Sequence, residues 1–265
     1  MRAMKIKSFI PKPIRRAIKR IEARSQMAVS IAQNRLFGIA TTDYKRVPII
    51  INNFNRLEYL ERLIASLELR GYTNIYIIDN CSSYPPLLEY YRQTSYKVFR
   101  LKRNIGYRAL WESGIYNRFK HSFYVYTDVD MEIDPMCPDN FMERFIDIMS
   151  RYPLCQKVGF GIRIDNLPEC YSNKGQVVKW ESQFWQDEVE VGLYRAQIDT
   201  TFALYRPFCR GVASAYHQTF RTGFPYVIRH LPWYVDSANL SDEEQYYLQS
   251  IKSSTHWSVL SKGKK

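Results

Sequence analysis

The sequence predicts an α/β fold with an open, mostly parallel sheet flanked by helices. Two observations predict it. From residue 47 onward, short apolar runs typical of buried strands alternate with segments whose apolar residues recur at helical spacing. Polar or acidic residues follow three of these runs directly. Because sheets of this kind bind ligands at the carboxyl ends of their strands, we expect the functional site at that edge.

The first strand and helix have the clearest pattern. Residues 47–53 read VPIIINN, a continuous apolar run that ends in two asparagines, as a buried parallel strand does. Residues 56–69 follow with leucines at helical spacing, and Gly71 is a typical helix-ending residue. A second strand is predicted at 75–78, directly before Asp79 and Asn80.

The alternation continues to a third principal strand. We expect a helix near 85–93, a strand at 97–101 and a helix near 107–119. A strand at 123–127 follows and leads directly into the Asp-Val-Asp motif of residues 128–130. The carboxyl ends of three strands are therefore predicted to carry polar or acidic side chains.

Composition narrows the class of protein. A chain of 265 residues suits one large domain or two small ones, and its 15% aromatic content excludes a disordered chain. No run reaches the roughly 18–20 apolar residues of a membrane span. The five cysteines are odd in number and form no CxxC pair, so a disulfide framework is not expected and a reducing, cytoplasmic location fits better.

The net charge of +12 is concentrated at the N-terminus. Residues 1–46 hold twelve Lys and Arg against two acidic residues, whereas the other 219 residues hold 26 basic and 24 acidic ones. The nearly neutral body argues against a nucleic-acid-binding surface. Residues 1–46 therefore form a basic arm, separate from a domain at 47–265.

The arm is predicted to contain an amphipathic helix. The basic residues of the arm are not followed by the uninterrupted apolar segment that a secretory signal contains. Such a helix can lie at an anionic membrane surface, which would make the protein peripheral at the inner face of the membrane. Alternatively, its narrow apolar stripe packs on the domain or on a partner subunit. One face carries Ile14, Ile18, Ile21, Ser25, Ala28 and Ala32, and the other carries Arg15, Arg16, Lys19, Arg20 and Arg24.

Several nucleotide-binding classes lack their motif in this sequence. It has no GxGxxG after the first strand, no GxxxxGK[ST], and no glycine-rich loop of the kind found in sugar nucleotidyltransferases. The Asp-x-Asp pair remains. Two carboxylates just past a strand end can hold a divalent cation that keeps positions open for diphosphate oxygens. The alternative is a solvated turn with helix-capping aspartates.

Residues 47 to about 135 resemble the nucleotide-binding half of family 2-type GT-A glycosyltransferases. Four segments in order carry the resemblance: VPIIINNFNRLEYLERLIASL, IYIIDNCSS, LKRNIGYRALWESGI and FYVYTDVDMEI. The resemblance implies a GT-A fold and an enzyme that uses a nucleotide-sugar donor, commonly UDP-linked, with Mn²⁺ or Mg²⁺. Trp111 departs from the family pattern, in which many members have a small or polar residue.

The resemblance also implies roles for particular residues. Asn53 and Arg56 correspond to the first loop, which meets the nucleotide, and Asp79 corresponds to the carboxylate that contacts the base. Asn104 and Gly106 match the Asn-x-Gly beside the diphosphate.

The metal site is likewise implied by the resemblance. Asp128 and Asp130 match the metal-binding DxD, with Asp130 the more direct ligand, and Asp128 also borders the nucleotide sugar. His230 lies in the segment IRHLPWYVDS and is a candidate for the third ligand that some GT-A enzymes supply from a C-terminal His. A hydrogen-bonded structural role is the alternative for His230.

The second half of the domain, 136–265, is expected to bind the acceptor, while 47–135 binds the donor. Inverting transfer needs a carboxylate that takes the proton of the acceptor hydroxyl. We favour Asp199, at an apparent strand entry about 70 residues after the DxD, followed by Glu188. The downstream candidates are Glu181, Asp187, Glu188, Glu190 and Asp199.

Together these features predict a metal-dependent inverting glycosyltransferase. It would move a sugar from a nucleotide-diphosphate donor to a hydroxyl of a glycan or lipid-linked glycan, as in surface polysaccharide synthesis. A retaining GT-A enzyme, a phosphohydrolase that uses the acidic pair, and a non-catalytic GT-A-fold partner are the alternatives.

Overall fold

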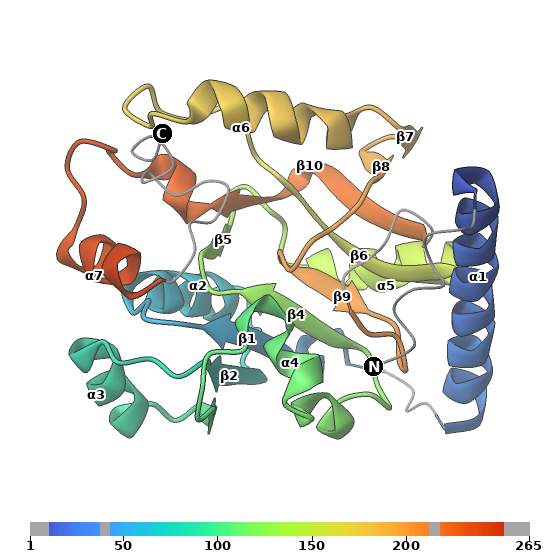
Figure 1. Cartoon of the computed structure of the whole chain (residues 1–265), viewed down its shortest axis with the longest axis horizontal. Coiled ribbons are helices and arrows are strands. Elements are labelled where there is room, and N and C mark those ends of the chain that lie inside the picture. Colours follow the sequence, from blue (N-terminus) through green and yellow to red (C-terminus); the bar gives the residue numbers. More distant parts are fainter. Residues whose placement is uncertain (1–10, 38–42, 212–217, 252–265) are drawn as a thin grey trace.

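A ten-stranded mixed sheet forms the centre of the computed structural model (Figure 1), which describes residues 11–37, 43–211 and 218–251. Nine strands follow the order β3-β2-β1-β4-β9-β6-β10-β8-β7, and β5 pairs with β10 off this path. The predicted α/β class is confirmed. Strands from both halves of the chain join the same sheet, so residues 47–135 and the later residues share one scaffold.

The segment of residues 47–128 contributes four neighbouring parallel strands to the sheet. Its strands are β1 (Ile49–Asn53), β2 (Ile75–Asp79), β3 (Lys97–Arg100) and β4 (Tyr124–Asp128), with β1 paired in parallel to both β2 and β4. Helices α2 (Glu58–Glu68) and α3 (Pro85–Gln93) lie where the sequence predicts them. Residues on both faces of β1, β2 and β4 are buried, as in other parallel sheets, whereas β3 lies at the edge and has no buried residue.

Alternation along β1 divides the core between the two faces of the sheet. Ile49 and Ile51 join a large apolar cluster that includes α2 and α5 (Phe141–Arg151), whereas Ile50 joins a smaller aromatic cluster. Successive strand side chains point to opposite faces, so one apolar run serves both clusters. Trp111 belongs to the smaller cluster, where its ring packs against Tyr126.

The predicted helix near 107–119 is wrong in its continuity. The segment forms three short pieces, η3 (Gly106–Arg108), α4 (Ala109–Glu112) and η4 (Ile115–Arg118). Gly114 separates the last two with a φ of +81°, a conformation that glycine adopts easily and that ends a helix.

The second half adds strands that pair in both directions, with β10 parallel to β6 and the other pairs antiparallel, and the remaining helices. Strand β9 (Ala203–Tyr205) runs antiparallel to both β4 and β6 (Cys155–Ile162), and the long β10 pairs with β6, β5 and β8. The other elements are β5 (Met131–Ile133), α6 (Lys174–Glu181), η5 (Ser182–Trp185), β7 (Glu188–Glu190), β8 (Leu193–Arg195), β10 (Gln218–His230), η6 (Leu231–Tyr234) and α7 (Asp242–Ser250).

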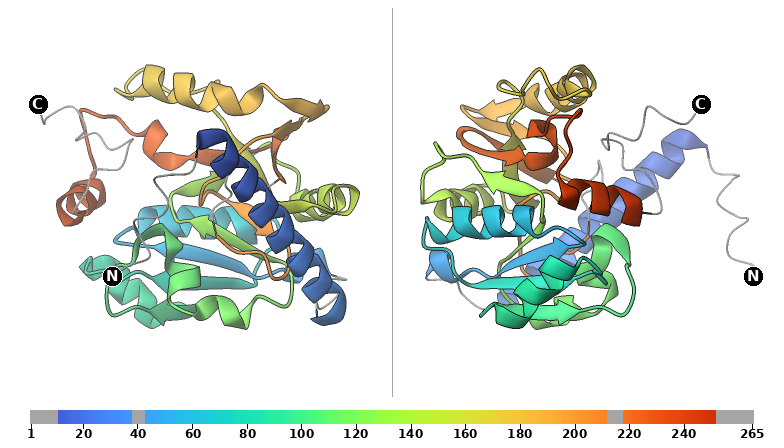
Figure 2. Two further views of the ribbon diagram at one scale, coloured as in Figure 1. Left: turned by 45° about the vertical axis from the view of Figure 1, so that its right-hand side comes forward. Right: turned by 90° about the vertical axis from the view of Figure 1, so that its left-hand side faces the viewer.

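The predicted basic helix of the N-terminal arm is present as α1 (Lys12–Phe37), at the outer edge of the molecule (Figures 1 and 2). The expectation that its stripe of Ile14, Ile18 and Ile21 packs on the domain is wrong. These side chains are exposed, and the helix docks through Ala23 and Met27 on its opposite side. Within the described residues, no helix combines the length and apolar content needed to cross a bilayer.

Candidate functional site

The carboxyl ends of β1, β2 and β4 meet at one edge of the sheet, because the three strands are neighbours and parallel. The pairing places Asn53 opposite Asp79 and Asn52 opposite Asp128. The register thus brings together three residues that the sequence analysis assigned to donor binding, Asn53, Asp79 and Asp128, from positions up to 75 residues apart.

Asp128, the last residue of β4, is held by Thr200 on both its backbone and its side chain. Its amide donates to the Thr200 carbonyl over 2.9 Å, and the Thr200 hydroxyl donates to its carboxylate. Burial, together with the nearby negative charge of Asp130, raises the pKa of Asp128 well above its ordinary value, although the bond from Thr200 works in the opposite direction.

Asp130 and His230 are adjacent because β5 pairs antiparallel with the end of β10, with His230 opposite Met131. His230 Nε2 lies 3.5 Å from Asp130 Oδ2. The Leu231 amide donates to the Asp130 carbonyl over 2.8 Å and fixes the turn. Burial lowers the pKa of His230, although Asp130 opposes this shift, so the neutral imidazole is favoured at neutral pH.

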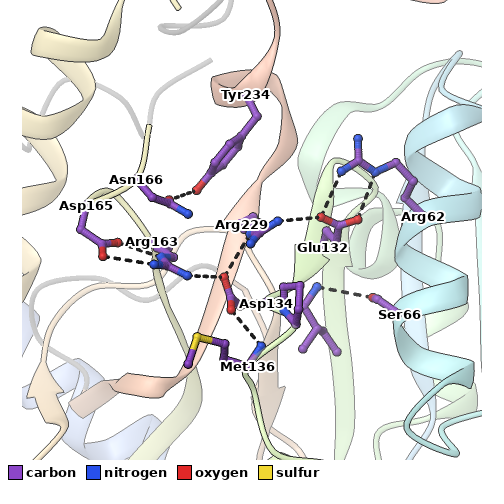
Figure 3. A network of polar contacts seen from close by, with 12 residues as sticks. Arg62, Ser66, Glu132, Asp134, Met136, Arg163, Asp165, Asn166, Arg229 and Tyr234 are labelled. Atoms are coloured by element: carbon purple, nitrogen blue, oxygen red, sulfur yellow. Dashed lines mark hydrogen bonds and ion pairs between the residues drawn. The ribbon is translucent and has the colours of Figure 1, made fainter. Parts of the chain in front are cut away.

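A network of ion pairs holds the strands that carry these two side chains (Figure 3). Glu132, two residues after Asp130, accepts two hydrogen bonds of 3.0 Å from Arg62 on α2. Arg229, directly before His230, donates to Asp134 over 3.0 Å and lies 3.8 Å from Glu132. The network therefore clamps β5 to β10 and to α2, which fixes where Asp130 and His230 lie.

Asp134 is the buried centre of this network. Arg163 and the Met136 amide also donate to it, each over 3.0 Å. Burial alone would raise the pKa of Asp134, but these hydrogen bonds and Arg229 hold it below its ordinary value.

The donor atoms of the acidic pair are suited to a divalent cation. Asp130 Oδ1 and His230 Nδ1 are buried and have no hydrogen-bond partner among the described residues. Within the same residues, no three His, Cys, Asp or Glu side chains gather closely enough to form a metal cage by themselves. An open site, in which a nucleotide supplies the other oxygens, needs fewer protein ligands than a closed cage.

Asp79 and Asn53 are anchored rather than free. Asp79 accepts a 2.8 Å hydrogen bond from the Ser82 amide and lies 3.3 Å from Arg100 Nε. The Asn53 amide nitrogen donates to the Tyr91 hydroxyl over 2.9 Å, while its Oδ1 is buried without a partner among the described residues. Both side chains therefore keep a fixed direction at the strand ends.

Arg56 makes a buried ion pair with Glu244 of α7, and its guanidinium lies 3.6 Å from the centre of the Tyr247 ring. Glu243 accepts hydrogen bonds from the Leu57 and Glu58 amides at the start of α2. These contacts hold α7 over the loop that follows β1. The predicted contact of Arg56 with the nucleotide stays a prediction, because the guanidinium is already paired.

Asn104 and Gly106 form the tight turn that the Asn-x-Gly pattern suggests. Asn104 Oδ1 accepts a 2.8 Å hydrogen bond from the Gly106 amide, and Gly106 has a φ of +76°. The Gly106 carbonyl accepts from Asn80 over 3.0 Å and from Asn52 over 3.5 Å. The turn is thereby tied to the ends of β1 and β2.

Asp199 lies beside Asp128 but outside any strand, because β9 begins only at Ala203. Its side chain is exposed, and its carbonyl accepts a 2.8 Å hydrogen bond from the buried Lys157. Burial lowers the pKa of Lys157 to about 7. The hydrogen bond from Lys157 therefore fixes the backbone at Asp199, while the Asp199 carboxylate faces solvent.

Glu188 lies far from this edge. It begins β7, the last strand in the sheet order, whereas β4 is separated from β7 by four strands. Its carboxylate accepts a 2.8 Å hydrogen bond from the Gly192 amide and closes the β7–β8 turn. A base at Glu188 stays untested, and its position favours Asp199 over it.

Four residues of this edge were not assigned by the sequence analysis: Asn52, Lys157, Thr200 and Tyr247. Asn52 lies opposite Asp128 in the register of β1 and β4, and burial raises the pKa of the Tyr247 hydroxyl, with smaller contributions from the charges of Asp130 and Asp128. The parallel register of β1 and β4 was the one signal that pointed to Asn52. The other three depend on long-range contacts.

No protein-family profile and no curated protein matches the sequence. Among solved structures, GalNAc-T7 with UDP, GalNAc and Mn²⁺ is similar over 69% of this chain and 43% of that one, at 16% identity and a TM-score of 0.46. S. aureus TarS 1–349 in complex with UDP is similar over 77% and 62%, at 12% identity and a TM-score of 0.42.

The chain spans less than two thirds of the length of these structures. S. aureus TarS 1–349 is similar over 71% of this chain and 60% of that one, at 13% identity and a TM-score of 0.43. Likenesses of this size concern the arrangement of the chain. What the site does has to be argued from the residues of this protein.

Proposed function

We propose that this protein is a metal-dependent glycosyltransferase that uses a nucleotide-diphosphate sugar, a UDP-sugar, as its donor. One observation carries the proposal: Asp128 ends β4 at the edge where β1 and β2 present Asn53 and Asp79, and Asp130 follows in the next turn, beside His230. An acidic pair beside polar strand ends suits a nucleoside diphosphate and its cation.

In this proposal each part of the edge binds one part of the donor. Asp79 and Asn53 hold the nucleoside, and the turn of Asn104 and Gly106 lies beside the diphosphate. Arg56 lies in the loop that follows β1, and its ion pair with Glu244 holds α7 over that loop. The anchoring of these side chains supports the proposal, because a site held rigid before binding loses less entropy on binding.

Asp128, Asp130 and His230 would hold Mn²⁺ or Mg²⁺. When bound, the ion offsets the negative charge that develops on the leaving diphosphate. Thr200 keeps the Asp128 carboxylate in place, and the ion-pair network around Asp134 keeps Asp130 and His230 together.

We further propose that transfer is inverting, with Asp199 as the base. Its carboxylate takes the proton of the acceptor hydroxyl as that oxygen bonds to the anomeric carbon and the bond from that carbon to the diphosphate oxygen breaks. Asp199 is exposed, so an acceptor can approach it, and its neighbour Thr200 contacts Asp128. The acceptor class is a glycan or lipid-linked glycan, at the cytoplasmic face of a membrane.

The experiment is an assay of UDP release from UDP-sugars with Mn²⁺, with and without glycan acceptors. Asp130→Ala should lower the rate more than roughly 100-fold, because a charge-stabilising group acts at the reacting bond. Glu169→Ala removes an exposed carboxylate that pairs with Lys174, outside the ion-pair network around Asp134, and serves as the control. Equal release by wild type and Asp130→Ala would refute the assignment.

A further inference from the structure

Helix α1 has two distinct faces, and only one of them contacts the domain. Ala23 and Met27 are buried, and the Ser30 hydroxyl donates to the Phe208 carbonyl over 3.3 Å. The Met27 sulfur lies 3.9 Å from the Cys209 sulfur. This docking face holds the second half of the helix against the loop that follows β9.

The opposite face is apolar and exposed. At about 100° per residue its side chains fall on one side of the helix, roughly opposite Ala23 and Met27. This exposed stripe consists of Ile14 (53% exposed), Ile18 (39%), Ile21 (64%), Val29 (56%) and Leu36 (73%). A row of five large apolar side chains in water is unusual and indicates a partner.

The first half of α1 stands clear of the body. Every side chain from residue 11 to 22 is exposed, and Figure 2 shows this end of the helix projecting beyond the sheet and its helices. A surface can therefore approach the exposed stripe without meeting the rest of the domain.

Positive charge flanks the exposed stripe. Arg15 and Arg24 lie at roughly a right angle to it on either side, and Lys19 and Arg20 lie somewhat further round. Lys and Arg side chains are long enough to keep their charged groups in the polar region of a membrane surface while the helix lies in that surface. Glu22 is the one acidic residue of this helix.

We propose that α1 lies on an anionic lipid surface, with the exposed stripe inserted among the acyl chains and the flanking Lys and Arg at the headgroups. A lipid surface and a second copy of this chain could each cover an apolar stripe of this kind, and charge distinguishes the two. A second copy would bring two arms of twelve basic and two acidic residues together, which repel each other, whereas an anionic surface attracts them. The inference does not rest on the proposed transfer reaction.

The test is flotation of the full chain with vesicles of phosphatidylcholine alone or of phosphatidylcholine and phosphatidylglycerol at three to one. We expect binding to the anionic vesicles to exceed binding to the neutral ones at least tenfold and to fall as the salt concentration rises. Equal binding to both vesicles, or binding to neither, would overturn the proposal.

The triple variant Ile14→Gln, Ile18→Gln and Ile21→Gln tests how much the apolar side chains contribute to vesicle binding. The helix is retained, because glutamine favours helices nearly as well as any polar residue. Burying one isoleucine changes an equilibrium by roughly tenfold or more, so the triple variant should bind anionic vesicles at least ~100-fold more weakly. Unchanged binding by this variant would mean that charge alone acts, which contradicts the insertion of the stripe.

A matched control carries three exposed apolar side chains elsewhere, Leu69, Leu154 and Val191, changed to glutamine. It should bind vesicles within twofold of wild type. Sedimentation equilibrium of both triple variants and wild type completes the test. A dimer of the wild type that dissociates in the Ile14, Ile18 and Ile21 variant, without vesicle binding, would show that a second copy covers the exposed stripe and would refute the lipid proposal.

Discussion

The buried ion pair between Arg56 and Glu244 predicts a large and specific loss of stability. The Arg56 side chain is 4% exposed and the Glu244 side chain 8% exposed, and 188 residues separate them. Glu244→Ala leaves the guanidinium buried between the rings of Tyr59 and Tyr247 without a counter-charge. Removing one partner of such a pair typically costs about 3–5 kcal/mol of unfolding free energy.

For a chain of this size, 1 kcal/mol corresponds to a change of about 2–4 °C in the melting temperature, so we expect Glu244→Ala to melt roughly 6–20 °C below wild type. The assay is thermal unfolding followed by circular dichroism, with urea titration as the second measurement. Glu89→Ala, which breaks the exposed pair of Glu89 and Arg92, is the control and should cost less than about 1 kcal/mol.

A double variant separates the charge from the packing. Arg56→Met with Glu244→Leu removes both charges and keeps apolar volume, so it should be more stable than Glu244→Ala alone. The same double variant asks whether Arg56 meets the nucleotide, because UDP affinity can be measured in a folded protein. A Glu244→Ala variant as stable as wild type would refute the reasoning that the pair anchors α7.

Three further outcomes follow from the site. Thr200→Val keeps the side-chain shape but removes the hydrogen bond to Asp128, and calorimetry should find Mn²⁺ affinity about 3–10-fold weaker. Asp199→Asn should lower turnover more than ~100-fold while UDP affinity stays within twofold, which steady-state kinetics and calorimetry will decide. Because the pKa of Asp134 is lowered in the fold, its ionised form stabilises the protein above a pH of about 4 and this contribution is lost below it. Urea unfolding of Asp134→Asn should therefore decline less between about pH 5 and pH 3 than that of wild type.

The parallel half of the fold was predictable because its signals are local. Each strand is a short apolar run, and the first polar residue marks where it ends, so β1, β2 and β4 were placed within two residues. The length of the helix near 107–119 was overestimated, since Gly114, in a left-handed conformation, breaks it. Periodicity alone does not report that break.

The meeting of three strand ends at one edge of the sheet was predictable for the same reason. Parallel neighbours bring strand ends together, so Asn53, Asp79 and Asp128 had to lie at one edge once the strands were in order. The proximity of His230 to Asp130 was suggested only by the family resemblance. Its physical cause is the antiparallel pairing of β5 with β10, which joins segments about 100 residues apart.

The contacts that pair distant side chains were not predictable. Ser241 caps α7 through a local contact, since its hydroxyl accepts from the Glu244 amide over 3.2 Å. Nothing in the sequence indicated that Glu244 also pairs with Arg56, or that Lys157 supports the carbonyl of Asp199. Such pairs depend on the tertiary fold, whose long-range contacts leave no local pattern.

The central claim is that the acidic pair at the end of β4 binds a divalent ion together with a nucleoside diphosphate. Titration calorimetry of UDP into the wild-type chain, with Mn²⁺ and with a chelator, tests it most directly. The account predicts binding that requires Mn²⁺ and that is lost in Asp130→Asn, while Glu169→Gln binds as wild type does. UDP binding of equal strength with the chelator, or unchanged binding by Asp130→Asn, would contradict it.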